Sequence, residues 1–291
     1  MSLVPLENYQ SEQHQDVWEN LKKFTDARIA IGRAGCSIPT HELLKFQLAH
    51  AEAQDAVHQA LDVEHLVASF NTLGLDSLTV NSQAENKQEY LKRPDLGRLL
   101  SPASQHGLEV FKASNPQNYD VCIVIGDGLS ARAIEENAVP FIQHLIPQLQ
   151  AEHWSIAPMV IATGSRVALG DPVAECLHAT MLVMLIGERP GLSSPDSMGI
   201  YYTWKAASGT LDAKRNCISN VRPAGLSIPV AVQRLMSLMR GSKKLGYSGV
   251  DLKDEHKMVS LDTEHTSKRL FGGVLKSMLT LNEAIIDVKE G

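Results

Sequence analysis

The second half of the chain alternates between short hydrophobic runs and segments with helical periodicity. Runs of this length are typical of strands that are buried on both faces of a sheet. The predicted strands are 119–125, 155–163, 181–186, 199–205 and 216–220. Helices are predicted at 131–150 and 229–240. This alternation predicts an α/β protein with a doubly wound sheet from about residue 118 onward.

The first part of the chain has the periodicity of helices. Residues 10–75 show few strand signals, and a broad hydrophobic stripe follows the helical period between residues 41 and 61. The stripe consists of Leu43, Leu44, Phe46, Leu48, Ala51, Ala56, Val57 and Leu61. We therefore expect a flexible N-terminal segment, a helical N-terminal subdomain, the sheet domain and an exposed or disordered C-terminal tail. Their expected boundaries are 1–16, 17–115, 116–250 and 251–291.

Composition limits the partners and ligands of the chain. It has 291 residues, of which 44% are hydrophobic, so a sizeable core can form. The net charge of −6 argues against nucleic acids and anionic membranes as partners, since both require a basic face. Apolar runs are far shorter than the roughly 20 residues of a membrane-spanning helix, and the N-terminus lacks a secretory signal. The four cysteines show no C-x-x-C spacing, so we expect a cytoplasmic protein with reduced thiols.

Three glycine-rich turns follow predicted strands, at 126–130, 164–171 and 187–194. Right-handed crossovers bring such turns to one edge of a parallel sheet, where ligands bind beyond the carboxyl ends of the strands. In the third turn, Glu188 and Arg189 place a carboxylate and a guanidinium on a stiff loop, which favours a ligand site. The alternative is an exposed turn with solvated charges. In the second turn we expect Asp171 to cap a helix.

The first turn imitates a dinucleotide-binding fingerprint. Residues 126–131 fit G-x-G-x-x-A between a strand and a helix. However, the next predicted strand has no acidic residue at its end to hold a ribose hydroxyl, and Asp127 would repel a pyrophosphate. A nicotinamide-dependent oxidoreductase is therefore an alternative, while a different large ligand fits better. A metal site on His50 and His58 is disfavoured because no third ligand accompanies them.

Seven motifs occur in a fixed order between residues 17 and 249. They are GRAG (32–35), HAEAQDAVH (50–58), RPDLGR (93–98), VIGDGLSARAI (124–134), GSRVALGDP (164–172), GERPGL (187–192) and NCISN (216–220). Together they resemble the small subunit, or light chain, of ethanolamine ammonia-lyase. The resemblance implies a Rossmann-like cobalamin-binding domain preceded by a helical portion.

The resemblance also implies a reaction and a partner. Enzymes of this family convert ethanolamine to acetaldehyde and ammonia by a radical mechanism, with adenosylcobalamin as the cofactor. The large subunit, a (β/α)8 barrel, holds the substrate, and the small subunit covers the cofactor from the other side. The sequence has no D-x-H-x-x-G motif, which fits a cofactor that keeps its own dimethylbenzimidazole on cobalt.

Three residues carry over as cofactor contacts, and none as a catalytic or metal-binding residue. Glu188 would accept hydrogen bonds from corrin amides, and Val167 would offer apolar contact and a main-chain partner. Cys217 would pack against the corrin as a small buried residue. All three are expected at strand ends. For each of them, ordinary core or turn packing is the alternative.

One further interpretation of the whole chain stays open. It is a stand-alone cobalamin-binding or chaperone-like module without a catalytic partner. The apolar surface expected on the helical N-terminal region favours the enzyme subunit. Encapsulation in a bacterial microcompartment is left open, because the N-terminus lacks the long leader that some members carry.

Overall fold

The computed structural model describes residues 19–253, so the predicted segment 1–16 and nearly all of the predicted tail lie outside the described residues. The α-helices are α1 (Thr40–His58), α2 (Val63–Thr72), α3 (Lys87–Lys92), α4 (Pro102–Ser114), α5 (Ala131–Ala151), α6 (Gly170–Cys176) and α7 (Ile228–Leu245). The strands are β1 (Ser77–Asn81), β2 (Tyr119–Gly126), β3 (Met159–Thr163), β4 (Ala179–Gly187), β5 (Met198–Trp204) and β6 (Arg215–Val221). Short 3-10 helices are Glu19–Lys23, Leu96–Arg98, Val167–Leu169 and Asp212–Lys214. Within 19–253, no helix combines the length and apolar character needed to cross a membrane.

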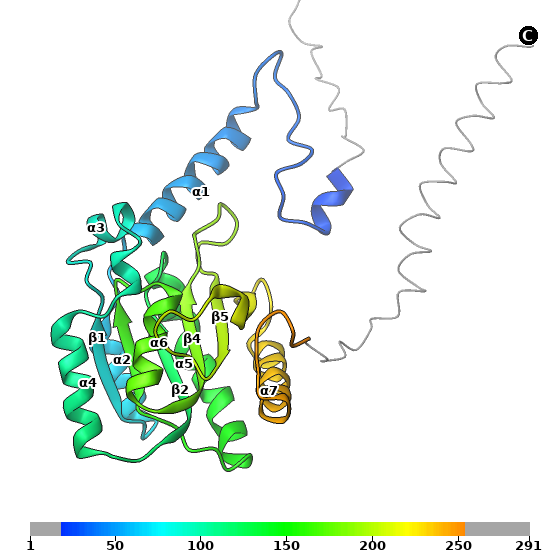
Figure 1. The fold of residues 1–291 in the computed structure, drawn as a ribbon. Helices are drawn as coiled ribbons and strands as arrows, with labels where there is room; N and C mark the ends of the chain where they lie inside the picture. Colours follow the sequence, from blue (N-terminus) through cyan, green and yellow to red (C-terminus); the bar gives the residue numbers. More distant parts are fainter. Residues whose placement is uncertain (1–18, 254–291) are drawn as a thin grey trace, which may run out of the picture. The chain divides into compact units, whose positions relative to one another are not determined.

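The six strands form one mixed sheet in the order β1-β3-β2-β4-β5-β6 (Figure 1). Strands β1, β3, β2 and β4 are parallel, whereas β5 runs antiparallel to both β4 and β6. The carboxyl ends of β2, β3 and β4 therefore meet at one edge, as the turns in the sequence predicted. The predicted α/β class is confirmed, although the sheet is not parallel throughout.

The edge strand β1 lies in the segment 17–115, which was predicted to be helical. It pairs in parallel with β3, from Ser77 opposite Met159 to Asn81 opposite Thr163. Only Val80 is fully buried within it. This segment thus contributes a strand as well as helices, and the boundary expected at residue 115 stays a prediction.

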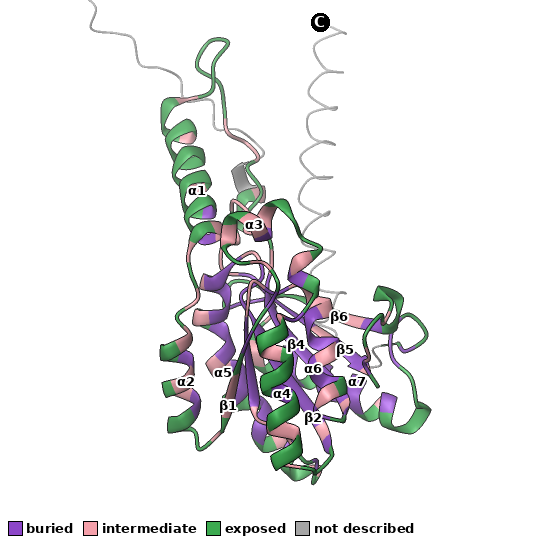
Figure 2. Ribbon diagram, turned by 60° about the vertical axis from the view of Figure 1, so that its left-hand side comes forward, coloured by how far each residue is buried: buried purple, intermediate pink, exposed green. Residues whose placement is uncertain are grey.

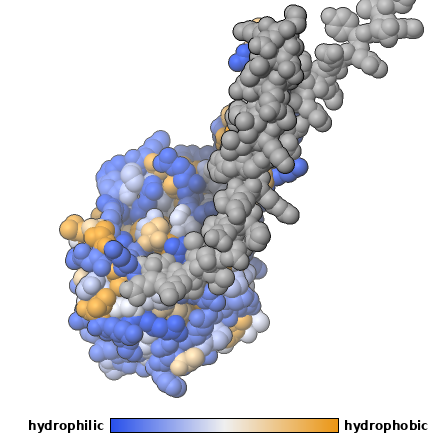
Figure 3. Space-filling view, turned by 90° about the vertical axis from the view of Figure 1, so that its right-hand side faces the viewer, coloured by the Kyte–Doolittle hydropathy of each residue, from blue (hydrophilic) through white to orange (hydrophobic). Residues whose placement is uncertain are grey.

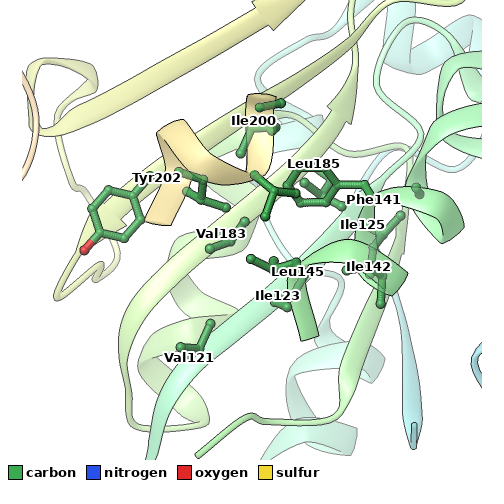
Figure 4. Packing of buried hydrophobic residues seen from close by; sticks show 14 of the residues in the cluster. Val121, Ile123, Ile125, Phe141, Ile142, Leu145, Val183, Leu185, Ile200 and Tyr202 are labelled. Carbon is green, nitrogen blue, oxygen red and sulfur yellow. The ribbon is translucent and has the colours of Figure 1, made fainter. Parts of the chain in front are cut away.

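Helices cover both faces of the sheet and bury a separate hydrophobic cluster on each (Figure 2). Helices α2, α5 and α7 pack on one face, while α4 and α6 pack on the other. The alternation along β2 shows the division, because Ile123 and Ile125 belong to the first cluster and Cys122 and Val124 to the second. In Figure 4, Phe141 of α5 lies among the residues of the first cluster.

Helix α7 is amphipathic and begins and ends with typical residues. Pro229 stands in its first turn, and Gly246 ends it in the left-handed conformation, with φ of +79°. Its buried hydrophobic residues are Ala231, Val232, Leu235, Met236, Leu238 and Met239. Figure 3, which looks at the side lying to the right in Figure 1, shows a mostly hydrophilic surface with small hydrophobic groups.

Helix α1 differs from the helices that cover the sheet. Only Ala53 and Ala56 are buried in it, and Leu44 and Leu48 are 59% and 62% exposed. Accordingly, most of α1 is coloured as exposed in Figure 2. The predicted stripe therefore lies on α1 except for Leu61, which follows the helix, and the described part of the chain leaves much of the stripe uncovered.

Candidate binding crevice

Two adjoining cavities lie where the parallel strands end. The larger has a volume of about 560 Å³ and the smaller about 370 Å³. Arg166, Val167 and Tyr201 line both cavities, so we treat the two as one crevice. The larger cavity is also lined by Pro94, Asp95, Arg98, Ala168, Asp212, Arg215 and Cys217. The smaller is also lined by Tyr90, Gly128, Leu129, Ile186, Gly187, Glu188 and Arg189.

The three predicted contact residues all line this crevice. Val167 begins the 3-10 helix that follows β3, and Glu188 directly follows β4. Cys217 differs from expectation in two ways, since it is the third residue of β6 rather than at a strand end, and it is exposed rather than buried. The reason is that no helix of the described chain covers this face of β6, where Ser219 is exposed as well.

The carboxylate of Glu188 is fixed by three donors, one from its own loop and two from the end of β6. Ser197 Oγ donates to Oε2 at 2.5 Å, and the backbone N–H of Asn220 donates to the same oxygen at 3.2 Å. The hydroxyl of Ser219 donates to Oε1. Glu188 is thus no freely solvated turn residue. It connects the β4–β5 loop to the end of β6, and its position in the crevice is set by these contacts.

A stacked pair that the sequence interpretation did not single out lies between the two cavities. The guanidinium carbon of Arg166 lies 4.6 Å from the ring centre of Tyr90, within the range of a cation–π contact. A Cβ on Gly97 would come within 2.9 Å of Tyr90 Cε2 and 3.0 Å of Arg166 Cγ. Gly97 of the RPDLGR motif therefore makes room for the pair, and its carbonyl accepts the Arg166 backbone N–H at 2.8 Å.

Comparison with known proteins assigns the chain to a family. The model of the family "Ethanolamine ammonia-lyase light chain (EutC)" matches residues 15–253. The chain belongs to this family. It is 48% identical over 250 residues to the ethanolamine ammonia-lyase small subunit of Pseudomonas fluorescens strain Pf0-1, covering 86% of this chain and 91% of that relative. The small subunit of Azotobacter vinelandii strain DJ is 47% identical over 248 residues, covering 85% and 92% of the two chains.

Membership confirms the family and the enzyme class that the seven motifs predicted. The light chain is one subunit of an ammonia-lyase. The matched region contains every residue of the crevice, so the crevice belongs to the family part of the chain.

The turn after β2 does not form a phosphate cradle in this light chain. Asp127 Oδ1 accepts the N–H of Gly128 and the N–H of Ser165, both at 2.9 Å. The N–H of Leu129 donates to the carbonyl of Gly187 at 3.0 Å. A dinucleotide phosphate needs such N–H groups to be free. The occupied turn therefore argues against the nicotinamide alternative on physical grounds.

The prediction that Asp171 caps a helix is wrong. The 3-10 helix 167–169 leads directly into α6, and Asp171 lies within its first turn. Its carboxylate instead accepts two hydrogen bonds from Arg215, at 2.6 and 2.7 Å, in a buried ion pair. Burial raises the pKa of Asp171, and the guanidinium opposes that shift. The pair joins α6 to β6 and supports one wall of the larger cavity.

The thiol of Cys217 lies against Tyr201 on the neighbouring strand. The two residues are cross-strand partners. Although Cys217 is exposed as a residue, partial desolvation of its thiol raises the pKa of that thiol, and burial together with Cys217 raises the pKa of Tyr201 to about 12. Cys217 is therefore held as a neutral thiol, which is a poor metal ligand. Among residues 19–253, no three His, Cys, Asp or Glu side chains gather as a metal site would require.

Proposed function

We propose that this chain is the small subunit of an adenosylcobalamin-dependent ethanolamine ammonia-lyase, which converts ethanolamine to acetaldehyde and ammonia by a radical mechanism. The observation that carries the proposal is that Val167, Glu188 and Cys217, which are far apart in the sequence, line one crevice. Family membership supports it independently.

The residues of the crevice fit a corrinoid. A corrin is a broad, flat ring with an apolar centre and amide side chains at its edge. The open side of β5 and β6 presents Tyr201 and Cys217, and the turns beside it present Glu188 as an acceptor and Arg166 as a donor. The buried Nε of Arg166 has no hydrogen-bond partner within the described residues, as expected of a donor that awaits a ligand.

Each proposed contact residue has a distinct role. Glu188 accepts hydrogen bonds from amide N–H groups, and such bonds are strengthened by its charge. Val167 offers an apolar side chain, and the thiol of Cys217 allows the ligand to approach the strand closely. These residues bind and orient the cofactor and exclude water from it. We assign no catalytic residue to this chain, because the bound cofactor supplies the radical chemistry.

The proposed partner is the large subunit, which holds the substrate. The exposed leucines of α1 and the half-exposed Phe46 offer apolar surface for such a partner. The N-terminal subdomain at 17–115 is then the docking part and the domain at 116–250 the cofactor part. We propose a cytoplasmic location. Enclosure in a bacterial microcompartment within the cytoplasm stays an open alternative.

The test is co-expression of the chain with a large subunit, followed by an ethanolamine deamination assay with and without adenosylcobalamin. We expect activity only when both subunits and the cofactor are present. Activity of the purified chain alone would overturn the division of labour. Failure of the two chains to co-purify, together with cyanocobalamin binding by the chain alone, would favour the stand-alone module. Saturable binding of a reduced dinucleotide without any corrinoid binding would favour the oxidoreductase.

A further inference from the structure

Arg166 is a crevice cation that stacks on Tyr90 but has no acceptor for its guanidinium N–H groups among the described residues. Within residues 19–253 its side chain forms no hydrogen bond or ion pair, and its Nε–H is buried and unpaired. Arg189, which also lines the crevice, has no such partner within these residues but is exposed to solvent, whereas other cations around the crevice are paired. Lys87 lies 3.8 Å from Asp127 and donates to the carbonyl of Gly128, and Arg215 is paired with Asp171. A buried donor that stays unpaired is costly, so its retention calls for an acceptor from outside residues 19–253, and its place on the crevice makes a bound ligand the natural source.

The position of Arg166 is also fixed in advance. The ring of Tyr90 supports the guanidinium, and the close approach of Gly97 leaves little room for the Arg166 stem to shift. Tyr90 is itself held, because its hydroxyl donates to the carbonyl of Ser165 at 3.1 Å. The side chain lines both cavities from this fixed support. A planar, pre-positioned guanidinium suits recognition of oxygen acceptors better than a mobile ammonium group does.

We propose that Arg166 is a cofactor-binding residue that donates hydrogen bonds to an acceptor oxygen of the cobalamin. The proposal rests on the proposed function and adds a donor to the acceptor supplied by Glu188. Two parts of the ligand carry such oxygens, the phosphodiester of the nucleotide loop and the carbonyls of the corrin amides. Cobinamide retains the corrin amides but lacks the nucleotide loop, so it separates the two sources.

The experiment uses the complex of this chain with its large subunit. Dissociation constants for cyanocobalamin and dicyanocobinamide are measured by titration calorimetry on wild type, Arg166→Gln and Arg166→Lys. We expect Arg166→Gln to weaken cyanocobalamin binding by about 10- to 100-fold, because a charge-assisted bond is lost. Arg166→Lys keeps the charge but not the planar fork, so a smaller loss is expected. Arg240→Gln, which removes an exposed cation on α7, is the matched control and should bind like wild type.

The two ligands identify the source of the oxygen. A loss confined to cyanocobalamin assigns the phosphodiester, and an equal loss for both ligands assigns a corrin amide. If wild type holds cobinamide too weakly to measure, the cyanocobalamin series alone decides for or against Arg166. Wild-type affinity in Arg166→Gln overturns the inference, and a lowered Tm would then show that Arg166 serves only to pack on Tyr90. If Arg166→Gln fails to assemble, wild-type affinity in Arg166→Lys overturns it. Absence of corrinoid binding to wild type would instead refute the proposed function.

Discussion

The two faces of β5 and β6 differ in burial, although both faces are formed by alternate residues of the same two strands. On one face, Tyr202 and Ile218 are buried in the cluster formed with α5 and α7. On the other face, Tyr201 is half-buried and Cys217 and Ser219 are exposed. The first face stabilises the fold and the second lines the crevice. The comparison teaches that an uncovered sheet face, bordered by turns with fixed polar groups, is available for a flat ligand.

The largest contrast is expected from adjacent residues on these two faces. Ile218→Ala removes a side chain that is 3% exposed, and we expect it to lower the free energy of unfolding by about 2–4 kcal/mol. Cys217→Ala, one residue away on the open face, should cost less than about 1 kcal/mol. Urea unfolding of both variants measures the difference. Equal losses would show that the open face is as important for stability as the packed one.

The next effect concerns the fixed carboxylate beside the open face. Glu188→Ala should weaken cyanocobalamin binding by the complex by about 10- to 150-fold, since a charge-assisted hydrogen bond is worth about 1.5–3 kcal/mol. Glu188→Gln keeps an acceptor oxygen and should lose less. Because Ser197, Ser219 and Asn220 also donate to this carboxylate, we expect Glu188→Ala to lower Tm as well.

Glu136→Ala, which removes an exposed carboxylate on α5 that does not line the crevice, is the control for Glu188 and should change neither quantity strongly. A lowered Tm with unchanged affinity in Glu188→Ala would leave Glu188 as an anchor of the turn only.

A smaller effect is expected from filling the space beside the Arg166–Tyr90 pair. In Gly97→Ala the new Cβ would lie 3.0 Å from the carbonyl oxygen of Gly164, besides its contacts with the pair, so something must shift. We expect a loss of about 1–2 kcal/mol in unfolding free energy and weaker cyanocobalamin binding. Gly107→Ala on α4 meets no atom within 4 Å and should be neutral or stabilising by up to about 1 kcal/mol. Similar outcomes for the two variants would show that the crevice tolerates displacement of the pair.

The parts of the fold that the sequence predicted are those with strong local patterns. Strands β2 and β4 were predicted because both faces are buried, which requires continuous hydrophobic runs. Strand β1 was missed because it is a short edge strand in which only Val80 is fully buried. Its pairing with β3 depends on residues about 80 positions away, which periodicity does not reveal.

For the candidate site, the structure bears on where the predicted residues lie, while their role as cofactor contacts stays a prediction. Motif positions led to Val167, Glu188 and Cys217, and the structure places all three on the crevice. The prediction of a helix cap at Asp171 was wrong, because it considered only neighbouring residues, whereas the partner Arg215 lies 44 residues away in the sequence. Arg166 stands inside a noted motif, yet its stacking on Tyr90 is visible only in three dimensions. The sequence offered one indication of this pair. Gly97 in the RPDLGR motif stands where Tyr90 and Arg166 approach the backbone closely.

The central claim is that the open face of β5 and β6 receives the cofactor. The most direct test is cyanocobalamin affinity of the complex after Cys217→Trp, which places a large side chain in the crevice without disturbing the packed face. The matched control is Val250→Trp, at a position that is 75% exposed and does not line the crevice. We predict at least about tenfold weaker binding for Cys217→Trp, with wild-type Tm and normal assembly with the large subunit, and no change for the control. Wild-type affinity in an assembled Cys217→Trp complex would contradict the claim.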